Sequence, residues 1–156
     1  MSVMTSTLLC LFLFSSGDAS IYKDKTYEIK FGIIDEGHGA DNVITSETLR
    51  IPKLLRETGF VFGFIVWSEE KENFKVDVKL ELPSPPEKAT IDGVMDLESL
   101  NGGMDFIYSI STETGRLASM FTFDDSDPLG EWKITIKIDG RVIKEVEFTV
   151  FEPEDN

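Results

Sequence analysis

The sequence has little of the chemistry on which most active sites depend. It contains one cysteine, Cys10, and one histidine, His38, among 156 residues. One cysteine cannot form an intramolecular disulfide. Any triad built on histidine would depend on His38, which lies between two glycines, and no Gly-x-Ser-x-Gly elbow is present to supply the nucleophile. We therefore expect no catalytic residues in this chain.

Basic residues are also scarce, because 15 Lys and Arg stand against 29 Asp and Glu, a formal net charge of −14. A chain this acidic repels nucleic acid, and no cluster of Lys and Arg is present to overcome that repulsion. We expect no nucleic-acid partner. One interpretation of the acidic excess is that it keeps the protein soluble, and another is attraction to a basic partner.

Long apolar runs are missing as well. The run at residues 8–14 is too short for a membrane-spanning helix, which needs roughly 20 residues. The small residues Gly17 and Ala19 follow it at the positions that signal peptidase reads. This pattern predicts a cleavable signal peptide over residues 1–19, which would remove Cys10. It also predicts an exported protein, periplasmic or secreted, without a membrane span.

From residue 27 onward the dominant pattern is alternation with a period of two, which is typical of strands with one buried face. In residues 74–82 every even position is apolar and every odd position is charged. Residues 27–33 and 104–110 repeat the alternation. These three segments predict half-buried strands, and residues 117–123 predict a further, less regular strand.

Residues 60–67 are apolar at both even and odd positions, which predicts a strand that is central or covered on both faces. Phe60, Phe62 and Phe64 are expected to anchor the core, where burial of one Phe contributes about 2 to 3 kcal/mol. Gly63 among them predicts a bulge or the close approach of another backbone.

The last two strands predict a hairpin around Asp139-Gly140. A two-residue turn with regular pairing would place charged and apolar partners on one face. We therefore predict a three-residue loop, residues 138–140, with Gly140 at positive φ. This register pairs Ile136 with Val142 and Trp132 with Val146.

About seven to nine short antiparallel strands separated by turns predict an all-β fold, an immunoglobulin-like β-sandwich. The length fits a single domain over residues 20–156. The residues expected to form its core and hold its turns are Phe31, Phe60, Phe62, Gly63, Phe64, Trp132, Gly140 and Phe148.

Several short motifs occur in a fixed order along residues 27–151. They are Phe31-Gly32-Ile33, Ile51-Pro52, Phe62-Gly63-Phe64, Gly130-Glu131-Trp132 and Phe148-Thr149-Val150. With this order the chain resembles an uncharacterised bacterial domain-of-unknown-function family of small, often exported, Ig-like proteins. The resemblance implies a sandwich fold and supplies no catalytic residues.

Acidic loops are the candidates for metal binding. Asp124, Asp125 and Asp127 could gather around Ca²⁺, which takes several oxygen ligands, but their spacing departs from the EF-hand pattern. Asp35, Glu36 and Asp41 form a second loop of the same kind. We prefer the interpretation that both are solvated acidic turns, and we expect no cofactor.

These observations favour a non-enzymatic module that binds another envelope or extracellular protein, by a loop or by strand addition. The alternative is a glycan-binding or small-ligand domain, with Ca²⁺ organising a loop. Trp67 and Trp132 could line a carbohydrate surface, but both lie in apolar runs, and we expect them in the core. Hydrolysis by paired carboxylates is the third hypothesis and the least favoured.

Overall fold

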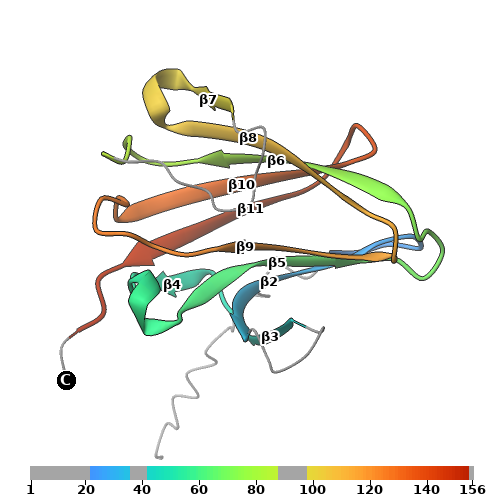
Figure 1. Cartoon of the computed structure of the whole chain (residues 1–156), viewed down its shortest axis with the longest axis horizontal. Helices are drawn as coiled ribbons and strands as arrows, with labels where there is room; N and C mark the ends of the chain where they lie inside the picture. The colour runs from blue at the N-terminus through green and yellow to red at the C-terminus, as the bar shows by residue number, and fades with distance from the viewer. Residues whose placement is uncertain (1–21, 36–41, 88–97, 155–156) are drawn as a thin grey trace, which may run out of the picture.

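The computed structural model describes residues 22–35, 42–87 and 98–154. Within these residues eleven strands form two sheets, which lie face to face as the layers of a sandwich (Figure 1). The predicted all-β sandwich is confirmed. The strand number exceeds the expected seven to nine because β1, β4 and β7 have only two or three residues each. The predicted signal peptide and His38 lie outside the described residues.

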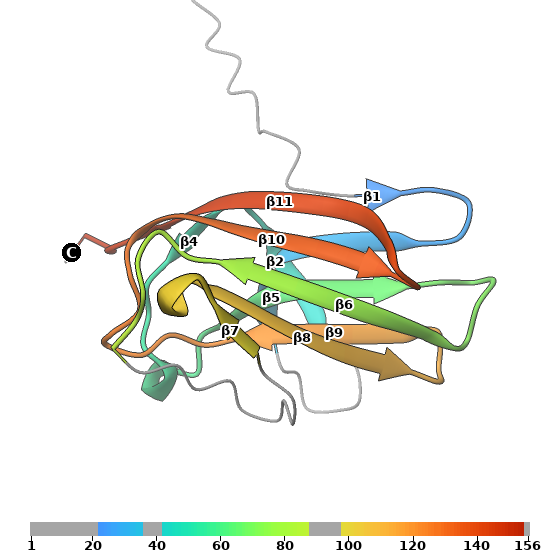
Figure 2. The ribbon, with the colours of Figure 1, turned by 90° about the horizontal axis from the view of Figure 1, so that it is seen from above.

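The two sheets have different sizes, and Figure 2 shows how their strands fan across each other. The first sheet has the order β1-β2-β5-β9, with β3 also paired to β2, and consists of β1 (Tyr22–Lys23), β2 (Glu28–Asp35), β3 (Val43–Glu47), β5 (Val61–Trp67) and β9 (Arg116–Phe121). The second has the order β4-β11-β10-β6-β8-β7 and consists of β4 (Arg50–Pro52), β6 (Phe74–Glu81), β7 (Glu98–Leu100), β8 (Asp105–Thr112), β10 (Gly130–Ile138) and β11 (Arg141–Phe151). Two short 3₁₀ turns are η1 (Arg56–Thr58) and η2 (Asn101–Gly103).

The alternating segments form strands that bury one face. In β6 the side chains of Phe74, Val76, Val78 and Leu80 are buried, and the charged residues between them face solvent to differing extents. The segments at residues 27–33 and 104–110 become β2 and β8, whose buried positions also alternate at first. The period of two therefore identified the inward faces correctly in these strands.

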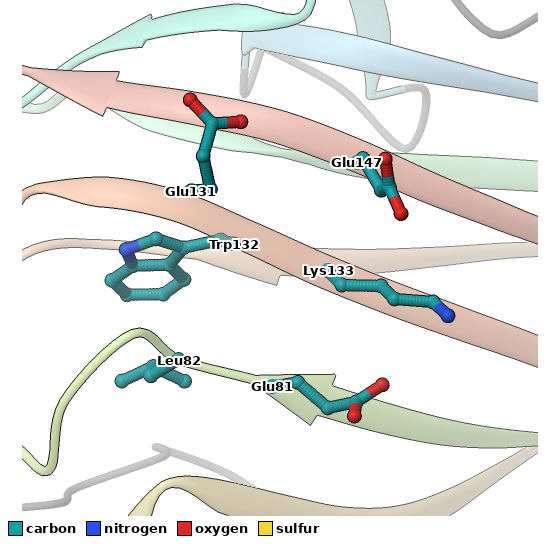
Figure 3. Close-up of a pocket in the computed structure, with 6 residues that line it drawn as sticks. All are labelled: Glu81, Leu82, Glu131, Trp132, Lys133 and Glu147. Carbon is teal, nitrogen blue, oxygen red and sulfur yellow. The ribbon is translucent and has the colours of Figure 1, made fainter.

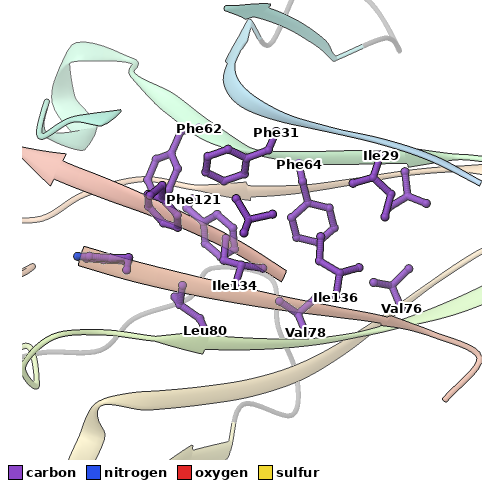
Figure 4. Packing of buried hydrophobic residues seen from close by; sticks show 14 of the residues in the cluster. Ile29, Phe31, Phe62, Phe64, Val76, Val78, Leu80, Phe121, Ile134 and Ile136 are labelled. Atoms are coloured by element: carbon purple, nitrogen blue, oxygen red, sulfur yellow. The ribbon is translucent and has the colours of Figure 1, made fainter. Parts of the chain in front are cut away.

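The core lies between the sheets and is rich in aromatic rings (Figure 4). Phe31, Phe62 and Phe64 are fully buried, and Phe148 and Trp132 are nearly so. The Phe62 ring stacks on that of Phe123 with centroids 4.6 Å apart. Such contacts add to the free energy of burial, because offset and edge-on aromatic pairs are favourable beyond their area.

β5 is the central strand of the first sheet, between β2 and β9, as its apolar composition predicts. Two expectations for its ends need correction. Phe60 precedes the strand and is only half-buried against the margin of the core. The expectation that Trp67 packs in the core is wrong, because Phe62, Phe64 and Val66 take the inward face and Trp67 falls on the other parity.

The close backbone approach expected at Gly63 is present. A Cβ at Gly63 would lie 2.0 Å from the carbonyl oxygen of Ser119 in β9, and a Cβ at Gly32 would lie 2.0 Å from that of Ser46 in β3. Gly32 and Gly63 are direct partners in the β2–β5 ladder. Neither position has room for a side chain.

The β10–β11 hairpin differs from its predicted form. Its turn has two residues, Asp139 and Gly140, both at positive φ, with Ile138 opposite Arg141. The alternation of apolar residues excludes a two-residue turn with regular pairing. A two-residue turn fits this alternation here because Ile143 forms a bulge that shifts the register. The predicted register is therefore wrong by two residues.

The bulge has a clear effect on which side chains are buried. Trp132 pairs with Phe148 and Ile134 with Val146, so these apolar residues share the inward face. Val142, expected on that face, is 51 % exposed.

No helix in the described part of the chain has the length and apolar character needed to cross a membrane.

Candidate functional site

The outer edge of β9 is the longest plain strand edge that the described residues leave unpaired. β9 pairs with β5 along its whole length, and no other described strand pairs with its far side. The carbonyl of Ser119 lies against Gly63, so the backbone groups of Ser119 are directed toward β5. Successive residues of a strand alternate in this direction. The N–H and C=O groups of Ala118 and Met120 therefore point away from β5, toward the open edge of the sheet.

Most other open edges are shorter or irregular, although β8 is also open beyond β7, at residues 108–112, which carry no charge and pair regularly with β6, and the five-residue β3 pairs with β2 alone. β4 has three residues and ends at Pro52, and β7 also has three residues. The part of β11 that β4 does not cover carries the bulge at Ile143 and the charged neighbours Lys144 and Glu145. Short strands, prolines, bulges and charges are the usual means of protecting an edge.

β9 lacks these protections. Its six residues, Arg-Leu-Ala-Ser-Met-Phe, include one charge, and its pairing with β5 is regular. Met120 is 40 % exposed beside the open edge. Arg116 begins the strand, where its guanidinium donates to the carbonyl oxygen of Asn42 and its own carbonyl accepts a hydrogen bond of 2.7 Å from the Thr112 hydroxyl. Ala118 and Met120 thus form an open backbone segment beyond this anchored start.

The acidic loop predicted as a metal site follows β9 directly. Asp124 Oδ1 accepts hydrogen bonds from the Ser126 N–H at 2.8 Å and the Ser126 hydroxyl at 2.7 Å. Asp127 Oδ2 accepts the N–H of Asp124 at 2.8 Å. These carboxylates stabilise a turn, and in the described part of the chain no three Asp, Glu, His or Cys residues converge on a possible metal position. Of the second acidic loop, Glu36 and Asp41 lie outside the described residues.

Three residues of this loop, with Glu87 from the connection after β6, line a surface hollow of about 430 Å³. The exposed lining residues Asp124, Asp125 and Glu87 are all acidic. The Lys53 ammonium donates a hydrogen bond of 2.9 Å to the carbonyl oxygen of Asp125, and this bond holds the loop in place. Burial raises the pKa of the neighbouring Asp127 carboxyl. We call this feature, defined by Glu87, Asp124, Asp125 and Ser126, the acidic hollow.

A second hollow, of about 300 Å³, lies where β6 ends and β10 begins (Figure 3). Its carboxylates and ammonium project from adjacent strands, but most are already engaged. Lys133 Nζ is 2.9 Å from Glu145 Oε1, which raises the pKa of that lysine, and Glu131 accepts the Thr149 hydroxyl at 2.7 Å. This hollow is lined by Glu81, Leu82, Glu131, Trp132, Lys133 and Glu147.

The two tryptophans offer little surface to a sugar ring. Trp132 is 4 % exposed, and its indole N–H donates to the carbonyl oxygen of Pro128 at 2.9 Å. Trp67 is half-buried, with the Lys30 ammonium 5.7 Å from its ring centroid. Stacking on a carbohydrate needs an open aromatic face, so these positions do not favour the glycan-binding alternative.

Comparison with known proteins identifies the family of this fold. The PM0630 beta sandwich domain matches residues 29–151, which begin in β2 and end with β11. The chain belongs to this family. No curated protein matches the sequence.

A solved structure has a fold similar to that of this chain. An immunoglobulin-like protein from Pseudomonas aeruginosa is 15 % identical in sequence and superimposes with a TM-score of 0.50 over 86 % of this chain and 99 % of the other. At this identity the likeness concerns the fold alone. Together the two matches confirm the bacterial Ig-like family and the sandwich that the sequence motifs predict.

Within this sandwich, one polar contact escaped prediction. Tyr108 in β8 and Ser119 in β9 share a hydrogen bond of 2.7 Å between their hydroxyls, and both side chains are buried. Burial raises the pKa of Tyr108 far above its ordinary value, so the phenol is neutral. The contact joins the two sheets beside the open edge. The sequence feature that indicates it is Ser119, a polar residue at one of the inward-facing positions of β9.

Proposed function

We propose that this protein is an exported, non-enzymatic module that binds an extended segment of another protein along the open edge of β9. The observation that carries the proposal is the outer edge of β9, six regular and nearly uncharged residues that no other described strand pairs with. An added strand obtains affinity from main-chain hydrogen bonds and specificity from its alternate side chains. Ala118 and Met120 supply the unpaired backbone groups that such a strand requires.

Export is the second part of the proposal, and it rests on the apolar run at residues 8–14 followed by Gly17 and Ala19. Cleavage after Ala19 would deliver the sandwich to the periplasm or the exterior, where the partner would be an envelope or extracellular protein. Intact mass spectrometry of the protein from its native cells checks this. A species that begins near Ser20 is expected, and full-length protein in the cytoplasm would overturn it.

Crosslinking in living cells tests the binding site. A photoreactive amino acid replaces Met120, which is 40 % exposed on β9, and in a matched strain it replaces Val142, which is 51 % exposed on β11. We expect one partner to be captured in near-stoichiometric amount from position 120 and not from position 142. Equal capture from both positions, or capture from position 142 alone, would contradict an interface at β9.

A further inference from the structure

We infer that Asn101, in the turn between β7 and β8, is a site of spontaneous deamidation, and that its isoaspartyl product releases β7 from the edge of β8. This inference is independent of the proposed function. It rests on the residue that follows Asn101, on the exposed and unbonded side chain of Asn101, and on the slight attachment of β7.

Asn101 stands in a sequence context that suits an intramolecular reaction of its side chain. It precedes Gly102, whereas Asn42 and Asn73 precede valine and phenylalanine. Deamidation begins when the backbone nitrogen of the next residue attacks the side-chain carbonyl carbon of asparagine. A side chain on that next residue hinders the approach, and glycine has none and gives the backbone the greatest freedom to rotate.

The turn leaves the Asn101 side chain open to this reaction. Asn101 and Gly102 lie in η2 with φ of 54° and 68°, and both residues are exposed. Among the described residues, none forms a hydrogen bond with the side-chain amide of Asn101. A Cβ at Gly102 would meet nothing within 4 Å, so the space beside the reacting nitrogen is open.

The similar dipeptide Asp139-Gly140 lacks this freedom. Its two residues also have positive φ, of 48° and 83°. The Asp139 carboxylate, however, lies 2.9 Å from the Lys71 ammonium and accepts the Lys75 N–H at 3.2 Å. Charge-assisted hydrogen bonds hold a side chain in one position, and a carboxylate is also a weaker electrophile than an amide. We therefore expect no comparable reaction at Asp139.

The reaction at Asn101 needs no reagent other than water. The Gly102 nitrogen forms a bond to Cγ of Asn101, the bond from Cγ to Nδ2 breaks, and ammonia leaves with the proton that the Gly102 nitrogen gives up. Water then opens the resulting cyclic imide at either of its carbonyl carbons. One opening gives aspartate. The other gives isoaspartate, whose main chain runs through Cβ and Cγ and is one carbon longer.

β7 is the element that this change affects, because its attachment is slight. Its residues, Glu98–Leu100, are all exposed, and within the described chain they pair only with residues 105–107 of β8. The turn that Asn101 begins sets this register, and the Met104 N–H closes it on the Asn101 carbonyl at 3.4 Å, a long hydrogen bond. A longer main chain at position 101 changes the span of the turn and breaks the register.

The backbone of β8 shows which hydrogen bond reports the release. The Leu82 N–H donates to the Met104 carbonyl, so the backbone groups of Met104 are directed toward β6. Because successive residues of a strand alternate, Phe106 also faces β6, and Ile107 faces β7, with which it pairs. Release of β7 would therefore free the Ile107 N–H. It would also extend the open edge of β8 from residues 108–112 to the start of the strand.

Peptide mapping of the aged protein tests the site. The purified protein is kept in a mildly alkaline buffer, which speeds the attack, and mass spectrometry follows the conversion of each asparagine. We expect Asn101 to convert about tenfold faster than Asn42 and Asn73, which corresponds to a barrier lower by about 1.4 kcal/mol. Equal rates at the three asparagines would overturn the inference.

Two further measurements separate the contributions of glycine and of the fold. Gly102→Ala should slow the conversion by about tenfold, because its Cβ hinders the attack, and a melting curve verifies that this variant is folded. In urea the unmodified protein should convert at Asn101 at nearly its native rate, because the native turn already leaves the side chain unrestrained. Conversion that needs urea would show that the fold protects Asn101, and an unaffected rate in the alanine variant would contradict the mechanism.

Hydrogen exchange tests the release of β7. The aspartyl and isoaspartyl products are separated by chromatography, and an isoaspartyl methyltransferase labels only the second. The Ile107 amide should exchange about tenfold faster in the isoaspartyl form than in fresh protein, while the Phe106 amide is unchanged. Asn101→Gly is the matched control, because glycine keeps the positive φ and has no amide to react. After the same incubation it should keep the slow exchange of fresh protein.

The aspartyl product distinguishes main-chain length from charge. It carries the same added negative charge as isoaspartate, but its main chain has the normal length, so its Ile107 amide should exchange as in fresh protein. Equal acceleration in both products would assign the effect to charge and overturn the release by a lengthened turn. Unchanged exchange in the isoaspartyl form would overturn the release altogether. Neither result bears on the capture of a partner from position 120.

Discussion

At the scale of single residues, the facing pair Gly32 and Gly63 fixes how closely the four strands β3, β2, β5 and β9 approach in the first sheet. We expect Gly63→Ala to destabilise the protein by more than about 3 kcal/mol, because its Cβ would overlap the Ser119 carbonyl, a backbone atom that cannot move alone. Gly102→Ala is the control. Gly102 also has positive φ, but a Cβ there meets nothing within 4 Å, so the expected loss is about 1 kcal/mol. Equal losses in denaturant titrations would refute the steric explanation.

The buried hydroxyl pair of Tyr108 and Ser119 suits a double-mutant cycle. Tyr108→Phe or Ser119→Ala alone leaves one buried hydroxyl without its partner, at an expected cost of about 1 to 3 kcal/mol. The double variant removes both groups and should lose clearly less than the sum of the two single losses. Strict additivity in urea unfolding would show that the two hydroxyls are not coupled.

Two aspartates should respond to pH in opposite directions. Hydrogen bonds from the N–H groups of Tyr27 and Thr26 lower the pKa of Asp24, so its charged form favours the folded state above the ordinary aspartate pKa of about 3.9. This contribution is lost as pH falls through the folded pKa. Burial raises the pKa of Asp127, so its charged form opposes folding at neutral pH.

We therefore expect Asp24→Asn to lower the melting temperature at pH 7 and Asp127→Asn to raise it. The difference at Asp127 should shrink as the pH is lowered toward 3, because its carboxyl then becomes protonated in both states. The difference at Asp24 should begin to shrink only below about pH 3.9, as the pH approaches the lowered pKa of the folded state. Differential scanning calorimetry between pH 3 and pH 7 checks this. Differences of the same sign, or differences that do not depend on pH, would contradict the assigned causes.

At the scale of elements, the β10–β11 hairpin depends on its bulge. Deletion of Ile143 removes the extra residue but preserves the pairs Trp132–Phe148 and Ile134–Val146, so the variant should fold with a loss of about 1 to 2 kcal/mol from the half-buried side chain. Deletion of Glu147 is the control, because it moves Phe148 or Val146 to the wrong face and should prevent folding. Cross-strand NOEs and melting curves distinguish the two, and equal tolerance would disprove the role of the bulge.

The same hairpin shows what alternation can and cannot predict. The inward face of β10 followed from the period of two, but registers that differ by two residues bury the same parity. Nothing in residues 139–143 distinguishes a three-residue loop from a two-residue turn with a bulge. In β5 both parities are apolar, so the sequence offered no way to tell that Trp67 would lie on the outer face.

The candidate site was predictable only in part, for a similar reason. The acidic loop at residues 124–127 is local in sequence and was identified there, and its carboxylates accept hydrogen bonds within a turn. The open edge of β9 depends on which strands become neighbours. That order comes from contacts between distant segments, such as β5 with β9, and period-two patterns carry no information about it.

At the scale of the whole molecule, the acidic excess should influence stability through repulsion. The described ion pairs are mostly exposed and contribute little each, whereas the formal net charge of −14 acts on the whole compact state. We expect the melting temperature to rise when NaCl is increased from about 0.01 M to about 0.15 M, because screening shortens the Debye length to about 8 Å. A fall over this range would mean that the ion pairs outweigh the repulsion.

The position of β11 has a consequence for the timing of folding. β11 lies between β10 and β4, and its parallel pairing joins Val150 to Ile51, which was synthesised long before it. A chain that leaves the ribosome N-terminus first cannot close the second sheet until these last residues have emerged. The nascent polypeptide therefore lacks a closed second sheet until late in synthesis, a state compatible with the export that we propose.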